Sequence, residues 1–307
     1  MASLDPLVSL AGFGVGLIVG LTGMGGGALM TPILVLLFGV APTAAVASDL
    51  AASLVMKPLG ALIHFRRGTV HRPMVQYLLI GSVPSAFAGA ALINHLGRSG
   101  NVNSAIKLLL GVALLVASGA QLAKTVLRNR RQGPPGASQV PIAPKPLPTI
   151  AIGVVGGFIV GMTSVGSGSL IIVMLMLLYP RLSGSRLVGT DLAQAIPLVG
   201  AAALGHFLFG HVSFGLTASL IAGSVPGVCL GAYGSARAPD RVIRPLLVLV
   251  LAASALKLLG ASNALVGVVV GGLATLGIAW AISEGRIEAR LASPAVDAES
   301  AAQAGGE

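Results

Sequence analysis

Charged side chains are scarce in this sequence: 19 Lys and Arg and nine Asp and Glu make up 9% of 307 residues. A soluble domain carries about 25%, so the composition excludes both a soluble globular protein and a charge-rich disordered one. A single cysteine, Cys229, excludes an internal disulfide and a cysteine-based metal cluster. Aromatic residues make up only 4%, so the net charge of +10 does not indicate a nucleic-acid partner.

The rest of the chain is strongly apolar. The hydrophobic fraction is 55%, glycine contributes 43 residues, and the mean hydropathy is +0.93. Five long windows carry no charge: 6–48, 73–97, 146–180, 192–236 and 258–283. A membrane-spanning helix needs about 20 apolar residues. The sequence therefore predicts an all-α, polytopic membrane protein with about 8–11 membrane helices.

The expected helices form two sets. The first set covers 7–22, 28–39, 44–65, 73–96 and 103–123. The second covers 148–163, 169–180, 188–209, 215–235, 243–259 and 263–283. The predicted organisation is a first transmembrane repeat (1–123), a basic Pro/Gly-rich cytoplasmic linker (124–148), a second repeat (149–260), an additional C-terminal transmembrane helix (261–283) and a polar tail (284–307).

The two sets are related by an internal repeat. GFGVGLIVGLTGMGGGAL, from Gly12, matches GVVGGFIVGMTSVGSGSL, from Gly153, at a shift of 153 − 12 = 141. With one inserted residue the shift becomes 142, which aligns Asp49-Leu50-Ala51 with Asp191-Leu192-Ala193 and GSVP at 81–84 with GSVP at 223–226. Chance similarity of glycine-rich segments does not explain the coincident acidic and proline positions.

The basic residues indicate how the repeats are oriented. Loops rich in Lys and Arg stay in the cytoplasm. If each glycine motif turns the chain back on itself, only Arg98 and Lys107 lie outside, and Lys57 and Lys257 fall within spans. The other 19 − 4 = 15 basic residues then share the cytoplasmic side. This distribution predicts two inverted repeats with short broken or re-entrant helices, an architecture typical of secondary transporters.

The glycine motifs are the first candidate binding site. Their residues are Thr22, Gly23, Gly25, Gly26 and Gly27 in the first half and Thr163, Ser164, Gly166, Ser167 and Gly168 in the second. Broken helices expose backbone N–H groups, which bind anions at helix N-termini. The alternative is close helix packing, which accounts well for the glycines preceding the first motif, Gly12, Gly16 and Gly20. No GK[ST] follows either motif, so a nucleotide-binding loop is not supported.

Three ionisable residues within the predicted helices are further candidates. Asp49 and Asp191 are candidates for coupling a proton or sodium ion, because ionisable residues in a membrane are costly and functional. The alternative places each carboxylate in the first turn of its helix, close to free backbone amides. Lys57 is expected to meet Asp49 or a bound anion, the alternative being an ammonium that reaches an interface.

His64 and His206 follow the two aspartates by fifteen residues. Histidine relays protons near neutral pH, so both are candidates for ion coupling. The alternative is an interfacial side chain at a helix end. One helix cannot bring an aspartate and its histidine together, because fifteen residues span about 22 Å.

Known catalytic patterns are missing. The sequence contains neither H-E-x-x-H nor G-x-S-x-G, and it has no metal-binding set of cysteines. We therefore expect no enzymatic activity, no cofactor and no bound metal. An ion gradient or the substrate's own gradient would supply the energy for transport.

The segments GFGVGLIVGLTGMGGGALMTPILVLLFGVAPTAAVASDLAASL, IGSVPSAFAGAAL, TSVGSGSL and GTDLAQAIP resemble the TauE/SafE family of membrane permeases. The resemblance covers about residues 7–260. It implies a multi-pass protein of the bacterial cytoplasmic membrane, built from duplicated helices. It also implies export of small sulfur-containing anions such as sulfite, sulfoacetate or related organosulfonates. It assigns no role to Lys57 or to the histidines.

The resulting hypothesis is a secondary transporter, with a small anion and the lipid bilayer as its partners. Alternating access would rock one repeat against the other. The alternatives are a permease for another organic anion such as a carboxylate, an anion channel, an intramembrane enzyme and a structural subunit. The sequence leaves the substrate, the direction of transport, the coupling ion and the oligomeric state open.

Overall fold

The computed structural model describes residues 4–22, 26–66, 68–97, 103–129, 143–210, 212–234 and 240–275. The chain forms two compact units, Met1–Ala261 and Ser262–Glu307. Within the second unit, the described residues include the short apolar helix Asn263–Thr275. The predicted C-terminal span 261–283 extends past the described residues, and the predicted tail 284–307 lies outside them.

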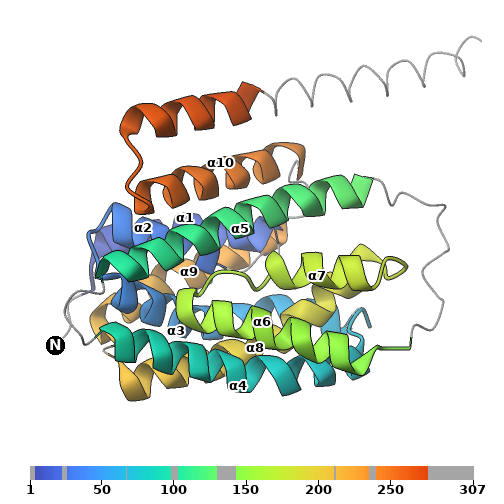
Figure 1. Cartoon of the computed structure of the whole chain (residues 1–307). Helices are drawn as coiled ribbons and strands as arrows, with labels where there is room; N and C mark the ends of the chain where they lie inside the picture. The colour runs from blue at the N-terminus through green and yellow to red at the C-terminus, as the bar shows by residue number, and fades with distance from the viewer. Residues whose placement is uncertain are drawn as a thin grey trace, which may run out of the picture. The chain divides into compact units, whose positions relative to one another are not determined.

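The first unit consists of helices in the described residues, as the sequence predicts (Figure 1). They are α1 (Pro6–Thr22), α2 (Gly27–Leu36), α3 (Pro42–Arg66), α4 (Arg72–Gly97), α5 (Asn103–Asn129), α6 (Pro146–Thr163), α7 (Leu170–Leu178), α8 (Gly184–Phe209), α9 (Phe214–Gly234) and α10 (Asp240–Leu258). Six of the described helices are long and apolar enough to cross a membrane. The all-α polytopic fold class is thereby confirmed.

Several helix ends differ from the sequence prediction. Helix α3 begins at Pro42 and α8 begins at Gly184, earlier than predicted. Proline is well tolerated in the first helical turn, where its missing N–H would have no partner. Helix α5 continues to Asn129, so the beginning of the predicted linker 124–148 is helical. These shifts matter below, because they place Asp49 and Asp191 deeper in their helices and bring Lys124 into α5.

Helices α6 and α7 form a helical hairpin around the second glycine motif (Figure 1). An added Cβ at Gly156, in the middle of α6, would lie 2.4 Å from Cγ1 of Ile171, near the start of α7. At the other end of the hairpin, the backbone N–H of Lys145 donates to the hydroxyl of Tyr179 at 2.8 Å. The two helices therefore run antiparallel, and α7 ends beside the residue that precedes α6.

Glycines bring α1 against α9 and α6 against α4 in backbone contact. A Cβ added at Gly16 of α1 would lie 2.4 Å from the carbonyl oxygen of Ser224 in α9. One added at Gly157 of α6 would lie 2.4 Å from the carbonyl oxygen of Ser82 in α4. The same role at Gly12 and Gly20 confirms the packing interpretation of the glycines that precede the first motif.

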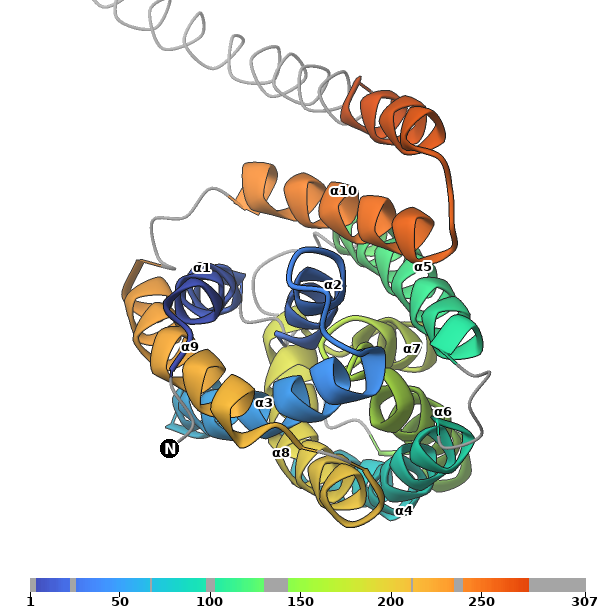
Figure 2. The ribbon, with the colours of Figure 1, turned by 90° about the vertical axis from the view of Figure 1, so that its left-hand side faces the viewer.

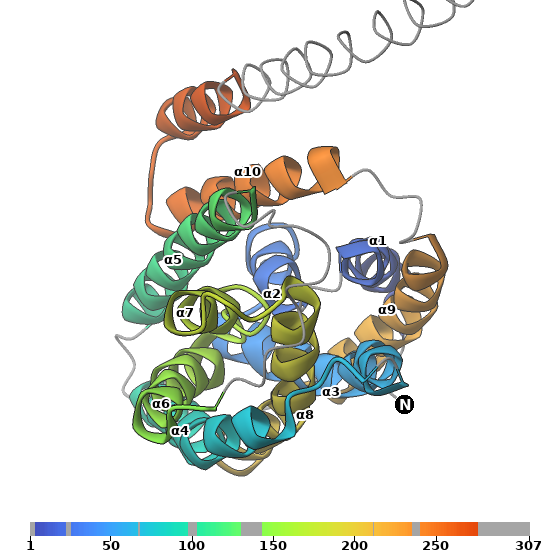
Figure 3. The ribbon, with the colours of Figure 1, turned by 90° about the vertical axis from the view of Figure 1, so that its right-hand side faces the viewer.

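These two contacts are counterparts under the sequence repeat. Gly16 corresponds to Gly157, and Ser224 corresponds to Ser82. Figures 2 and 3 show α1 beside α9 on one flank and α6 beside α4 on another, in views from opposite ends. Each pair joins one helix from each half, so the halves are interlocked. Their inverted orientation in the membrane stays a prediction.

We expect Gly16→Ala to lower the free energy of unfolding by about 1–3 kcal/mol, because the new methyl group has no room against the backbone of Ser224. Gly14→Ala is the matched control on the same helix, since its Cβ would meet no atom within 4 Å. The measurement is the midpoint of thermal unfolding in detergent. Equal midpoints for the two variants would contradict the backbone contact.

The topology is testable by labelling single cysteines in a Cys229→Ser background. Ser185 and Ser213 are exposed near opposite ends of α8. With the basic linker in the cytoplasm, we expect a membrane-impermeant maleimide added to intact cells to modify Ser213→Cys and spare Ser185→Cys. Labelling of Ser185→Cys from outside would overturn the predicted orientation.

Candidate functional site

The second glycine motif has a backbone conformation with positive φ angles, which residues other than glycine rarely adopt. Ser164 ends α6 in the left-handed region with φ 60°, Gly166 has φ 123° and Gly168 has φ 89°. Glycine reaches positive φ without steric cost, whereas an L side chain is strained there. The two glycines therefore let the chain leave α6 and return as α7, and the loop 164–169 places its serines in the interior.

The first motif meets the second directly. Gly27 is the first residue of α2, and a Cβ added to it would lie 2.0 Å from the carbonyl oxygen of Ser164. Gly26 precedes it at the helix N-cap. Gly23 and Gly25 lie outside the described residues, and of Thr22 the structure describes only its position at the end of α1. The described parts of the two motifs thus lie against each other.

Several backbone amides at the starts of the short helices already have partners. The N–H groups of Leu29 and Met30 bond to the carbonyl of Gly26. In α7, the N–H group of Leu170 bonds to the carbonyl of Gly166 at 2.9 Å. In this conformation, the groups that remain for a ligand are hydroxyls and ammonium groups rather than these amides.

Asp49 joins α3 to both motifs. Its side chain is fully buried, and Oδ2 accepts hydrogen bonds from Thr31 of α2 at 2.9 Å and from Ser164 at 2.8 Å. Its other oxygen, Oδ1, is buried and lies outside hydrogen-bond geometry with the described residues, although the side chain of Ser53 interacts with the carboxylate. Because α3 begins at Pro42, Asp49 lies about two turns into the helix. The alternative that places it in the first turn is wrong, and for Asp191 of α8 the same correction applies.

Lys57 is the cation of this cluster. Its side chain is 7% exposed, and its Nζ donates a hydrogen bond of 2.6 Å to Oγ of Ser167 in the second motif. The ammonium also attracts the carboxylates of Asp191 and Asp49. The side chain therefore stays in the interior and does not reach an interface. Its counterpart in the repeat is the buried Val199.

Asp191 is the other carboxylate that Lys57 attracts. Its Oδ1 accepts a hydrogen bond of 3.1 Å from Gln194, which in turn accepts one of 3.1 Å from Ser82 of α4. The backbone N–H of Gly168 also faces the carboxylate. Asp191 therefore connects α8 and α4 to the same loop that Asp49 and Lys57 hold from α3.

Lys124 is a site residue that sequence reasoning assigned to the linker. It belongs to α5, and its Nζ donates to the carbonyl oxygen of Gly168 at 3.3 Å. Its charge also attracts Asp191. Gln121 lies three residues earlier on the same side of α5 and is buried. The three-residue spacing of Gln121 and Lys124 could have indicated that both polar side chains share one face of a helix. It does so only if the helix continues past residue 123, which was not predicted from the sequence.

The histidines lie away from the charged cluster. His206 is fully buried, with Nε2 2.9 Å from the carbonyl oxygen of Gly161 and Nδ1 2.9 Å from the side-chain amide of Asn94. This pattern fits a neutral ring that donates from Nε2 and accepts at Nδ1. His64 is half-buried, with Nδ1 2.9 Å from Oγ1 of Thr69. Their role in ion coupling stays a prediction, because the hydrogen bonds described for them do not involve Asp49, Lys57 or Asp191.

Comparison with known proteins gives a consistent picture. Residues 8–258 match the family model described as sulfite exporter TauE/SafE. The chain is 39% identical over 254 residues to the "Probable membrane transporter protein YjnA" of Bacillus subtilis (strain 168), covering 82% of this chain and 98% of that protein. It is 25% identical over 261 residues to the "Probable membrane transporter protein YdhB" of the same organism, covering 82% and 99%. No solved structure matches the chain.

Removing the cation should destabilise the cluster. We expect Lys57→Met to lower the free energy of unfolding by about 3–5 kcal/mol, because two buried carboxylates lose the charge that attracts them. Adding Asp191→Asn should recover part of this loss, since one of the two stranded charges is then gone. Thermal unfolding in detergent measures both effects.

Lys107→Met is the matched control, because Lys107 is exposed on α5 and its loss should change stability by no more than about 0.5 kcal/mol. A Lys57→Met variant as stable as the control would contradict the electrostatic role of Lys57. Strict additivity in the double variant would contradict its attraction to Asp191.

Proposed function

Since the chain belongs to the TauE/SafE sulfite exporter family of membrane transporters, we propose that it exports small sulfur-containing anions, such as sulfite or organosulfonates. We place it in the bacterial cytoplasmic membrane. The observation that carries this proposal is Lys57: a buried ammonium in the middle of a span, bonded to Ser167 in the loop where the two glycine motifs meet.

The chemistry of the cluster suits an oxyanion. Ser164 and Ser167 are hydroxyl donors in one loop, and Lys57 and Lys124 bring positive charge to it from α3 and α5. Charge-assisted hydrogen bonds of this kind are the strong ones in a low-dielectric interior. A sulfite or sulfonate oxygen would take the place of a serine oxygen or a carboxylate beside Lys57.

Asp49 and Asp191 balance the lysines while no substrate is bound. Two carboxylates and two ammonium groups make the four-residue cluster formally neutral, which lowers the cost of burying them. An incoming anion adds negative charge, and a proton or sodium ion on a carboxylate would compensate it. This exchange is how we propose that ion coupling works, with Asp49 and Asp191 as the coupling residues.

The membrane potential supports the outward direction. A cytoplasmic membrane is negative inside, and moving one elementary charge through it is worth about 2.3 kcal/mol per 100 mV. An anion that crosses without a compensating cation is therefore driven out of the cell. Export needs no further energy source as long as fewer positive charges than negative charges leave together.

The moving parts differ from a simple rocking of one repeat against the other. Helices α1 and α9 are in backbone contact through glycines, and so are α6 and α4. Each of these pairs contains one helix from each half. We propose that each pair moves as a rigid body and that the short helices α2 and α7, with their motif loops, open and close between them.

The test is flux into proteoliposomes. We expect saturable uptake of sulfite and sulfoacetate that rises with a potential positive inside the vesicle. Lys57→Met should slow it at least about tenfold, because a charge-assisted hydrogen bond is worth about 1.5–3 kcal/mol. Lys107→Met is the matched control and should transport at the wild-type rate. Each variant is compared at an equal amount of folded protein.

Three results would redirect the proposal. Flux of acetate or succinate without flux of any sulfur-containing anion would identify a carboxylate permease. Current that grows linearly with driving force without saturation would identify a channel. Wild-type flux in Lys57→Met would remove this residue from the mechanism.

A further inference from the structure

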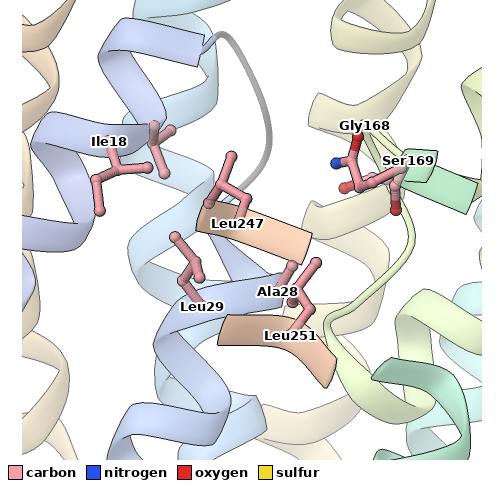
Figure 4. A pocket seen from close by; sticks show the side chains of 10 residues that line it. Ile18, Ala28, Leu29, Gly168, Ser169, Leu247 and Leu251 are labelled. Atoms are coloured by element: carbon pink, nitrogen blue, oxygen red, sulfur yellow. The ribbon is translucent and has the colours of Figure 1, made fainter. Parts of the chain in front are cut away.

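A small pocket adjoins the motif loop and is lined by both polar and aliphatic residues (Figure 4). Its polar end is formed by Ser167, Gly168 and Ser169 of the loop together with Gln121 of α5. Its other six lining residues are apolar and include Leu29, Leu247 and Leu251. The space open to the centre of a water molecule is about 10 Å³, which holds about one water. A larger ligand therefore requires the walls to separate.

The polar end contains a buried hydroxyl that is available to a ligand. Ser169 is 3% exposed, and its Oγ has no hydrogen-bond partner among the described residues. Gln121 is 7% exposed and faces the same pocket. An unsatisfied buried hydroxyl is unfavourable, so a ligand oxygen that accepts its hydrogen bond is stabilised there.

Two lysines bond to the residues of this polar end. Lys57 donates to Oγ of Ser167, and Lys124 donates to the carbonyl oxygen of Gly168. Both bonds end on loop residues that line the pocket. Two ammonium groups therefore bond to the loop whose hydroxyls line the pocket, which favours an oxyanion there.

The aliphatic end lacks any group that could pair with a charge. None of the described lining residues is ionisable, and the walls there are contributed by α1, α2 and α10. A second carboxylate or an ammonium group at this end would lose its hydration without compensation, which is unfavourable. A hydrocarbon tail, in contrast, gains from burial.

On the basis of the proposed function, we propose that this pocket binds organosulfonates with an uncharged aliphatic tail. The sulfonate lies against Ser167, Ser169 and Gln121, and the tail lies against Leu29, Leu247 and Leu251. Substrates with a charge at the far end, such as sulfoacetate, bind more weakly. Selectivity for the tail thus comes from α2 and α10, whereas recognition of the sulfonate comes from the loop.

The test uses competition against sulfite flux in proteoliposomes. Methane-, ethane- and propanesulfonate should inhibit with an affinity that rises about fourfold for each added methylene. Sulfoacetate should inhibit at least about tenfold more weakly than propanesulfonate. A direct flux assay of propanesulfonate shows whether it is carried and does not merely block.

Two pairs of variants localise the effect. Ser169→Ala removes a hydroxyl without an internal partner, so it should fold normally and bind every sulfonate about five- to tenfold more weakly. Ser224→Ala, at another buried serine without a partner, is its control and should bind normally. Leu251→Asn should reduce the gain per methylene, whereas Leu246→Asn, at an exposed position of the same helix, should preserve it.

The outcomes separate the two proposals. Absence of flux and of inhibition for all sulfur-containing anions would refute the proposed function. Sulfite flux with no dependence on chain length, or with sulfoacetate preferred over propanesulfonate, would refute the aliphatic pocket and leave the function standing. Equal loss of affinity in Ser169→Ala and Ser224→Ala would also refute the pocket.

Discussion

The arrangement of the site depends on one buried charge, the ammonium of Lys57. In a low-dielectric interior such a charge is tolerated only with hydrogen bonds and opposite charges around it. Ser167 supplies the hydrogen bond, and Asp49 and Asp191 supply the charges from two helices of different halves. The interactions of Lys57 therefore hold α3, α8 and the second glycine motif together. A charged ligand that binds beside Lys57 would therefore alter the electrostatic interactions that hold α3, α8 and the second glycine motif together.

The glycines shape the backbone, whereas the charged residues act through their side chains. At Gly16 and Gly157 they let long helices pack backbone to backbone, which fixes α1 on α9 and α6 on α4. At Gly166 and Gly168 they permit a backbone with positive φ, which breaks the helix and exposes the serines of the loop to the interior. The glycines thus produce two closely packed helix pairs and a broken helical segment between them, which is the combination that the proposed movement of rigid pairs around a central loop needs.

The sequence predicted the helices well because charge-free windows and the repeat constrain them strongly. It also identified Asp49, Asp191, Lys57 and the second motif, which the structure brings together. It missed Lys124, because the break in polarity at residue 124 resembles a linker although α5 continues. Thr31 and Gln194 were equally hidden, since their contacts join helices that lie far apart in sequence. Spacing along one helix cannot reveal such contacts.

The repeat is symmetric in its packing but not in its chemistry. The glycine contacts of α1 and α6 have counterparts, whereas Lys57 corresponds to Val199, and Ser164 and Ser167 correspond to Gly23 and Gly26. A perfectly duplicated site would offer an anion two equivalent positions, with the like charges of two lysines opposed across the centre. The absence of a lysine at position 199 avoids that repulsion, and the cations of the cluster, Lys57 and Lys124, both come from the first half of the chain. The asymmetry therefore favours one central anion site that both halves share over two sites of equal strength.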